Sequence, residues 1–151
     1  MLTEKPRDTQ RFTIPHDHEE IQDDDFLIRG VTAQSIAGNR ISKSFFQSSS
    51  DPYRGLSTDL DSQANDRSYT DGKPFIGAVK FFASSPRLNG LLVGYDPLEE
   101  NSHHCQVWNY DTTTSIASGL TQGMQKRLCD SSVWHSEVPD VTIRNYPPAS
   151  N

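Results

Sequence analysis

FLIRGV, at Phe26–Val31, opens the most informative stretch of the sequence, which runs from Asp25 to Leu60. FLIRGV is a short run of β-forming residues that carries one arginine and is broken by Gly30, which is the pattern of a buried strand with a charged side chain toward one end. Arg29 is therefore either a site residue or the partner in a structural ion pair, because a buried guanidinium must be paired and its planar fork suits carboxylates and phosphates. The sequence alone leaves both roles open.

Hydroxyl-bearing segments follow this strand. FFQSSSD, at Phe45–Asp51, sets two aromatic residues beside three serines, and GLSTDL, at Gly55–Leu60, follows after a proline turn. We expect the aromatic rings to anchor this region, because they bury a large apolar surface. The hydroxyls, including that of Ser57, then remain available to a ligand or cofactor.

The composition indicates one domain with polar ends. The chain has 151 residues, of which 33% are hydrophobic, and its mean hydropathy is -0.68. This length suits a single domain, but the polar composition leaves too little apolar surface to order the whole chain. We expect a disordered acidic, histidine-containing arm at residues 1–24, a single α+β domain at 25–135 and an extended or disordered tail at 136–151.

The charge limits the classes of partner. The net charge is -6 and the isoelectric point is near 5.2, whereas a general nucleic-acid binder or a binder of anionic membranes needs a basic surface. No stretch approaches the roughly 18 apolar residues of a membrane span, and the first residues lack the pattern of a signal peptide. We therefore expect a cytoplasmic protein that binds a protein partner, with no general nucleic-acid binding and no membrane contact.

The hydrophobic pattern predicts a small, mostly antiparallel sheet of about four to six strands packed by one main helix. Besides the first strand, it predicts strands at 41–46, 75–83, 91–95 and 104–109, a short helix at 32–38 and a turn at 86–90. The main helix is expected from about Thr113 to Leu128, because apolar residues recur there at four-residue steps. Trp134 is expected to cap the core.

Two histidines, His103 and His104, stand at a turn-to-strand boundary. A neutral imidazole moves protons or binds metal near neutral pH, so His104 is a candidate catalytic residue; otherwise the pair caps a strand or lies in solvent. No metal site is predicted, because no carboxylate or cysteine stands at a familiar ligand spacing. Cys105 and Cys129 are expected to be small buried hydrophobes.

A series of short motifs extends over residues 26–134. An arginine-bearing strand is followed by Ser-x-x-Phe, Leu-Ser-x-Asp and Asn-x-x-His steps and by a helix that ends near a tryptophan. In this sequence the motifs are Arg29, Ser42–Phe45, Leu56–Asp59, Asn101–His104 and Trp134. The series resembles a group of short prokaryotic proteins of unknown function. This resemblance implies no activity, and we expect a binding or accessory module without a cofactor, of the kind encoded in a defence or toxin-immunity locus.

A second resemblance gives the alternative function. LIRG, at Leu27–Gly30, followed by FQSSS, at Phe46–Ser50, is similar to the first two motifs of arginine-serine-glutamate ADP-ribosyltransferases. The resemblance implies that Arg29 holds the phosphates of NAD, that Ser49 stabilises the strand lining the nicotinamide pocket, and that Glu137 is the catalytic carboxylate. The protein would then be a small NAD-using enzyme, or a degenerate relative of one, with an anion pocket at Arg29 and Ser49.

Overall fold

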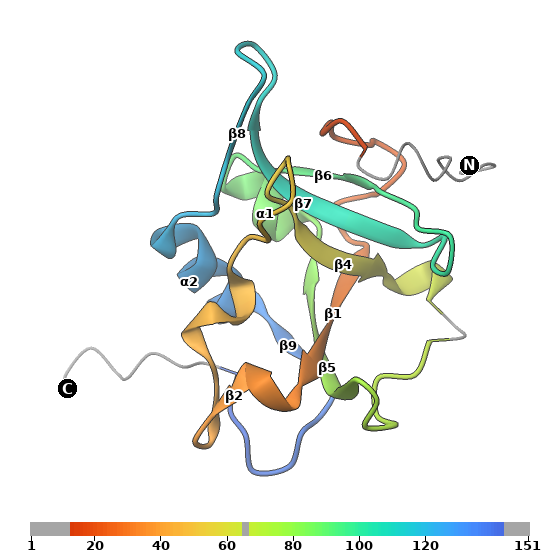
Figure 1. Ribbon diagram of the computed structural model, residues 1–151, viewed down its shortest axis with the longest axis vertical. Helices are drawn as coiled ribbons and strands as arrows, with labels where there is room; N and C mark the ends of the chain where they lie inside the picture. The colour runs from red at the N-terminus through yellow and green to blue at the C-terminus, as the bar shows by residue number, and fades with distance from the viewer. Residues whose placement is uncertain (1–12, 65–66, 144–151) are drawn as a thin grey trace.

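The structure, a computed structural model, describes residues 13–64 and 67–143. Within these residues seven strands form one sheet, and they are β1 (Phe26–Thr32), β4 (Leu56–Leu60), β5 (Phe75–Phe82), β6 (Leu92–Tyr95), β7 (His104–Asp111), β8 (Ile116–Ser118) and β9 (Val133–Ser136). Their order across the sheet is β6-β7-β4-β1-β5-β9, with β8 paired to β7 (Figure 1). Every pairing is antiparallel, and the α+β class predicted from the sequence is confirmed.

The remaining elements are short. They are the hairpin of β2 (Ile36–Ala37) and β3 (Arg40–Ile41), the helices α1 (Ser84–Leu88) and α2 (Gln122–Ser131), and the 3-10 turns η2 (Ala33–Ser35), η3 (Lys43–Phe46) and η4 (Asp61–Gln63). α2 is the one main helix of the described residues, and the hydroxyl of Thr121 caps its N-terminus by accepting from the backbone N–H of Met124. None of the helices in residues 13–64 and 67–143 has the length and apolar character needed to cross a membrane.

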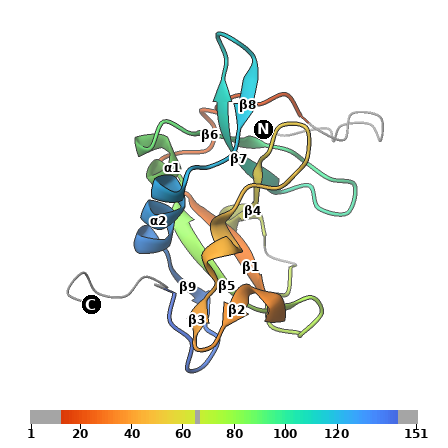
Figure 2. The ribbon, with the colours of Figure 1, turned by 60° about the vertical axis from the view of Figure 1, so that its left-hand side comes forward.

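The main core lies on one face of the sheet. Alternate residues of the strands point into it, and the buried side chains include Leu27, Val31, Leu56, Leu60, Val79, Phe81, Cys105 and Val107. Helices α1 and α2 lie side by side (Figures 1 and 2), and α2 adds the buried residues Leu128 and Cys129 to the core. Trp134 of β9 packs against this core, as the sequence predicts. Both cysteines are buried free thiols.

The sheet opens between β1 and β4. These strands pair only at Leu27↔Leu60 and Ile28↔Asp59, whereas β1 continues to pair with β5 as far as Thr32. In Figure 1, β4 and β7 run across the view while β1 and β5 run downward. Beyond Ile28, therefore, the two halves of the sheet diverge and leave a gap between β1 and β4.

The main helix starts later than the predicted Thr113. The Asp111 carboxylate accepts hydrogen bonds from the backbone N–H groups of Thr113 at 2.9 Å and Thr114 at 3.3 Å, which closes a turn between β7 and β8 instead of opening a helix. Ile116, the first residue of the expected apolar stripe, lies in β8 and is 59% exposed. The resulting β7–β8 hairpin projects from the body of the protein (Figures 1 and 2).

Other predicted elements have mixed outcomes. The strands expected at 75–83, 91–95 and 104–109 are confirmed as β5, β6 and β7. Of the short helix predicted at 32–38, one 3-10 turn forms as η2 after the N-cap Thr32, β2 follows it, and the chain turns back at Gly38, which has a φ of 65°. The strand predicted at 41–46 is limited to Ile41, because the Ser42 hydroxyl caps η3, and the turn predicted at 86–90 falls partly in α1.

The described segments before residue 25 and after residue 135 pack onto the domain predicted at 25–135. Ile21 is fully buried in the core, although the sequence predicts a disordered arm over residues 1–24. Arg87 holds the same segment through Asp17 at 3.0 Å and Asp23 at 2.9 Å. At the other end, the expected tail turns at Asp140, which has a φ of 65°, then meets β3 at Thr142 and buries Ile143. Residues 1–12 and 144–151, which complete the predicted arm and tail, lie outside the described residues.

His18 attaches the N-terminal segment to β6. Its backbone N–H donates to Val93, and its ring Nδ1 accepts from the backbone N–H of Tyr95 at 3.1 Å. Burial, helped by the neighbouring His16, lowers the pKa of His18 below its ordinary value of 6.5, while Glu20 and Asp17 oppose this shift. The neutral ring is therefore the form that the folded protein prefers.

This preference predicts a pH-dependent stability. Because the pKa of His18 is lower in the folded state, its contribution is fully present above pH 6.5 and is lost as the pH falls below 6.5. His18→Asn keeps an acceptor at the same position but does not titrate. Between about pH 7.5 and 5.5, we expect the Tm of the wild type to fall more than that of His18→Asn, as measured by circular dichroism. Equal slopes would contradict this role of His18.

Candidate functional site

A cleft of about 580 Å³ lies where β1 and β4 diverge. Its walls come from β1, η2, η3, β4 and the loops that precede β5 and β7, and the charged and polar side chains include Arg29, Ser57, Asp59, Arg67, Asn101 and His104. This volume is within the range of small-molecule sites in proteins. The cleft is therefore the candidate functional site.

Arg29 lies at the point where the ladder between β1 and β4 ends. Its Nε donates to the carbonyl of Phe45 at 2.8 Å and its Nη1 donates to the carbonyl of Ser57 at 2.7 Å. The guanidinium also lies over the Phe45 ring, 5.0 Å from the ring centroid. Burial lowers the pKa of Arg29 to about 10, so the group stays charged at neutral pH. Among the described residues, Arg29 forms no ion pair.

Gly30 does not break β1 as the sequence suggests, and it instead admits an aromatic ring. A Cβ built on Gly30 would stand 2.3 Å from the ring of Phe75, a distance that no side chain tolerates. Phe75 therefore packs directly on the β1 backbone. Because Phe75 also lines the cleft, the glycine beside Arg29 sets the shape of the site.

Asp59 is the centre of a buried hydrogen-bond network on β4. The residue is 5% exposed, and its carboxylate accepts from Asn101 Nδ2 at 2.7 Å and from the hydroxyl of Tyr69. Arg67 lies 3.0 Å from the same carboxylate. Burial, together with the hydrogen bond to Asp59, raises the pKa of Tyr69, so the phenol remains a donor. Both oxygens of Asp59 are thus occupied, and the network is structural.

The amide of Asn101 has one unused atom. A carboxylate can only accept, so the contact with Asp59 assigns Nδ2 as the donor and leaves Oδ1 on the other side of the amide. Asn101 is 4% exposed, and its Oδ1 has no hydrogen-bond partner in the described structure. A buried acceptor without a partner costs stability and is uncommon in native proteins. Asn101 lines the cleft, while the oxygen itself is enclosed by protein atoms, as are two nearby atoms that also lack a hydrogen-bond partner, Nε of Arg67 and Oε1 of Gln106.

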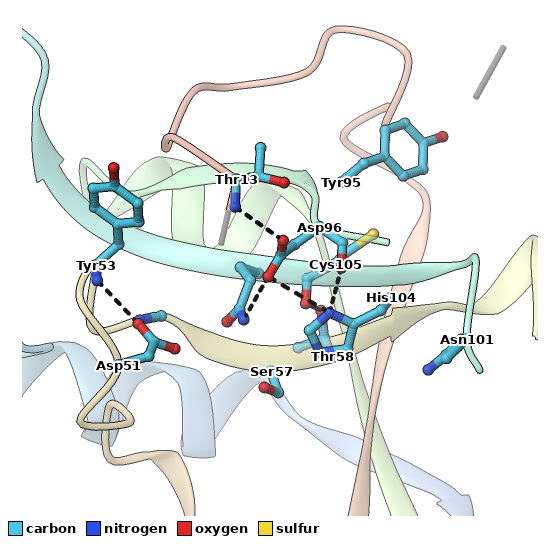
Figure 3. Close-up of polar contacts among 12 residues, drawn as sticks. Thr13, Asp51, Tyr53, Ser57, Thr58, Tyr95, Asp96, Asn101, His104 and Cys105 are labelled. Carbon is cyan, nitrogen blue, oxygen red and sulfur yellow. Dashed lines mark hydrogen bonds and ion pairs between the residues drawn. The ribbon is translucent and has the colours of Figure 1, made fainter. Parts of the chain in front are cut away.

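His104 is the first residue of β7, pairs with Asp59 of β4 and lines the cleft. Its Nδ1 lies 2.8 Å from the backbone carbonyl of Asp96, which can only accept, so Nδ1 carries the proton and Nε2 is the acceptor in the neutral ring. The Asp96 side chain accepts from Thr13 at 3.2 Å and from Gln106 at 3.1 Å. Figure 3 shows these contacts converging on Asp96, which holds the imidazole in place.

Cys105 lies on the opposite face of β7 and is fully buried in the core. Burial raises the pKa of its thiol, and the acidic side chains of Asp59 and Asp96 act in the same direction. The thiol therefore stays protonated at neutral pH and does not act as a nucleophile. Within the described residues, no group of three or more histidine, cysteine or acidic side chains is arranged to hold a metal ion.

The structure brings together some of the sequence-predicted site residues. Arg29, Ser57 and His104 all line the cleft. Ser49 instead lies in the loop before β4, where its hydroxyl donates to the Asp51 carboxylate at 2.6 Å. Glu137 is exposed directly after β9 and is not part of the cleft lining. The arginine, serine and glutamate of the transferase resemblance therefore do not share one cavity.

Sequence reasoning missed Arg67 and Tyr69. Both lie in a polar stretch that has the composition of a surface loop, and nothing in its pattern indicates that it folds back onto Asp59. The motifs of the first resemblance contain a usable signal, because Arg29, Phe45, Ser57, Asp59, Asn101 and His104 all belong to them and all line the cleft.

The chain was compared with protein-family models, curated proteins and solved structures, and none of these matches it. The resemblances drawn from the sequence therefore stay predictions. The site is interpreted from its own geometry.

The Asp59 network predicts a stability effect. Tyr69→Phe removes one hydrogen bond to a buried carboxylate, and we expect the free energy of unfolding to fall by about 1–3 kcal/mol. Urea denaturation followed by fluorescence measures it. Tyr53→Phe is the matched control, because Tyr53 meets Tyr110 through ring contact, and we expect a change within about 0.5 kcal/mol. A Tyr69→Phe protein as stable as the wild type would contradict the network.

Proposed function

We propose that the protein is a binding module that recognises an anionic group of its ligand through Arg29 in the cleft between β1 and β4. The observation that carries the proposal is a charged guanidinium that lines a cavity and has no ion pair among the described residues. A cation removed from water needs compensation, and only carbonyl dipoles and an aromatic ring supply it here.

The guanidinium keeps donors for a ligand. Arginine has five N–H groups in a planar fork, and the described structure uses the one on Nε and one on Nη1. These two bonds to Phe45 and Ser57 fix the orientation of the fork, which lowers the entropy lost on binding. A carboxylate or phosphate that reaches the remaining N–H groups would form short, charge-assisted hydrogen bonds.

Binding is better supported than group transfer. The alternative function, an NAD-using transferase, assigns roles to Ser49 and Glu137, and neither residue lines the cleft that contains Arg29. NAD nevertheless carries a diphosphate that suits a guanidinium, so it belongs among the ligands to be tested. A protein partner would present the same chemistry as an acidic side chain or a C-terminal carboxylate. The cytoplasmic location and prokaryotic origin expected from the sequence stay predictions.

The proposal predicts that anion binding depends on Arg29. We expect pyrophosphate, citrate or NAD to shift the amide resonances of cleft residues saturably in a ¹H–¹⁵N NMR titration of the full chain. Arg29→Gln should weaken this binding by about tenfold or more, because a hydrogen bond to a charged group contributes about 1.5–3 kcal/mol. Arg29→Lys, which keeps the charge and loses the fork, should have an intermediate affinity.

The matched control is Lys126→Gln. It removes the same charge from the exposed surface of α2, where Lys126 meets Asp130 at 2.9 Å, and it should leave the affinity unchanged. Circular dichroism checks that each variant folds. If Arg29→Gln does not fold, the affinity of Arg29→Lys still decides the test. Binding that is equal in all variants, or no binding of any of these anions at millimolar concentration, would overturn the proposal.

A further inference from the structure

We infer that the ligand of the cleft is a small zwitterion, an amino carboxylate whose carboxylate meets Arg29 and whose ammonium group meets the Glu100–Asn101 side of the site. This inference rests on the proposed function, because it takes the anion at Arg29 as given. It adds the second half of the ligand, which Arg29 alone does not specify.

The charges that line the cleft are balanced in a particular way. Asp59 and Arg67 neutralise each other at 3.0 Å. The lining then has one further cation, Arg29, and one further anion, Glu100, and neither forms an ion pair with a described residue. An anionic ligand such as phosphate would satisfy Arg29 and be repelled by Glu100. A ligand with one charge of each sign satisfies both.

Asn101 adds a polar amide beside Glu100. Its buried Oδ1 lacks a partner and accepts only N–H or O–H groups. Asn101 follows Glu100 directly in the loop before β7, and both residues line the cleft. An ammonium group has three donors and one positive charge, so it suits an amide oxygen beside a carboxylate.

The distance between the two ends sets the size of the ligand. The Arg29 fork is anchored 2.7 Å from the carbonyl of Ser57, and the Asn101 amide is anchored 2.7 Å from the carboxylate of Asp59. Ser57 and Asp59 are two residues apart on β4, which corresponds to about 7 Å along a strand. The two anchoring residues are therefore near neighbours on β4, which suits a small ligand whose two charges lie close together. Free amino acids and short peptides have this chemistry.

The experiment is a ligand-observed NMR screen of the full chain against each of the common amino acids and against glycylglycine. We expect saturable binding of at least one of them. The N-acetyl and the carboxamide derivatives of that ligand should each bind about tenfold more weakly or worse, because each removes one of the two charges. Binding of glycylglycine without binding of any amino acid would support the zwitterion and assign it to peptides.

The variant that tests the second half is Glu100→Gln. It should weaken binding of the zwitterion about threefold or more. It should not weaken binding of the N-acetyl derivative, an anion that Glu100 repels and that the variant should bind as well as or better than the wild type does. Glu99→Gln is the control, because Glu99 is the neighbouring exposed acid and is not part of the cleft lining. If pyrophosphate binds through Arg29 while amino acids and glycylglycine do not, or if the derivatives bind as well as the parent, the zwitterion is wrong and anion binding stands. If nothing binds, both fail.

Discussion

The guanidinium of Arg29 bridges two strands where their hydrogen-bond ladder ends. Continued pairing of β1 with β4 would bring Gly30 opposite Ser57, and the carbonyl of Ser57 would then belong to the ladder. Instead that carbonyl accepts from Arg29 at 2.7 Å. The side chain thus satisfies the backbone of one strand while keeping the other at a distance. The cleft lies where the Arg29 side chain, in place of the β1 backbone, bonds the carbonyl of Ser57 and keeps β1 and β4 apart.

Two networks fix the β4 side of this opening, one on β4 and one on the neighbouring strand β7. Asp59 gathers Tyr69, Arg67 and Asn101 onto the outer face of β4, and Asp96 holds His104 through its backbone carbonyl. Such satisfied buried networks rigidify their surroundings, whereas a single unsatisfied atom within them is costly. The oxygen of Asn101 is one of several such atoms, together with Nε of Arg67 and Oε1 of Gln106. The charge of Arg29, which has no ion pair among the described residues, is therefore the feature on which the proposed binding site rests.

The sequence predicts the strands better than it predicts the connections. Alternation places Cys105 and His104 on opposite faces of β7, and the structure has them so. The expected start of the main helix is wrong because the Asp111 turn competes locally with helix formation. Likewise, the segment around Ile21 is acidic and carries no periodic pattern, yet it packs onto the core through contacts with distant residues such as Arg87. Pairings of this kind depend on tertiary structure, which a single sequence does not specify.

The measurement that tests this account most directly is a crystal structure of the protein soaked in bromide, with the anion located by anomalous scattering. We expect Arg29 to donate to the carbonyls of Phe45 and Ser57, β1 and β4 to separate after Ile28, and an anomalous peak within about 4 Å of the guanidinium. The contrary result is Arg29 paired with the carboxylate of Asp59 or Glu100 and β1 zipped to β4 past Ile28. Arg29 would then be a structural ion-pair partner, and the cleft would not be a binding site.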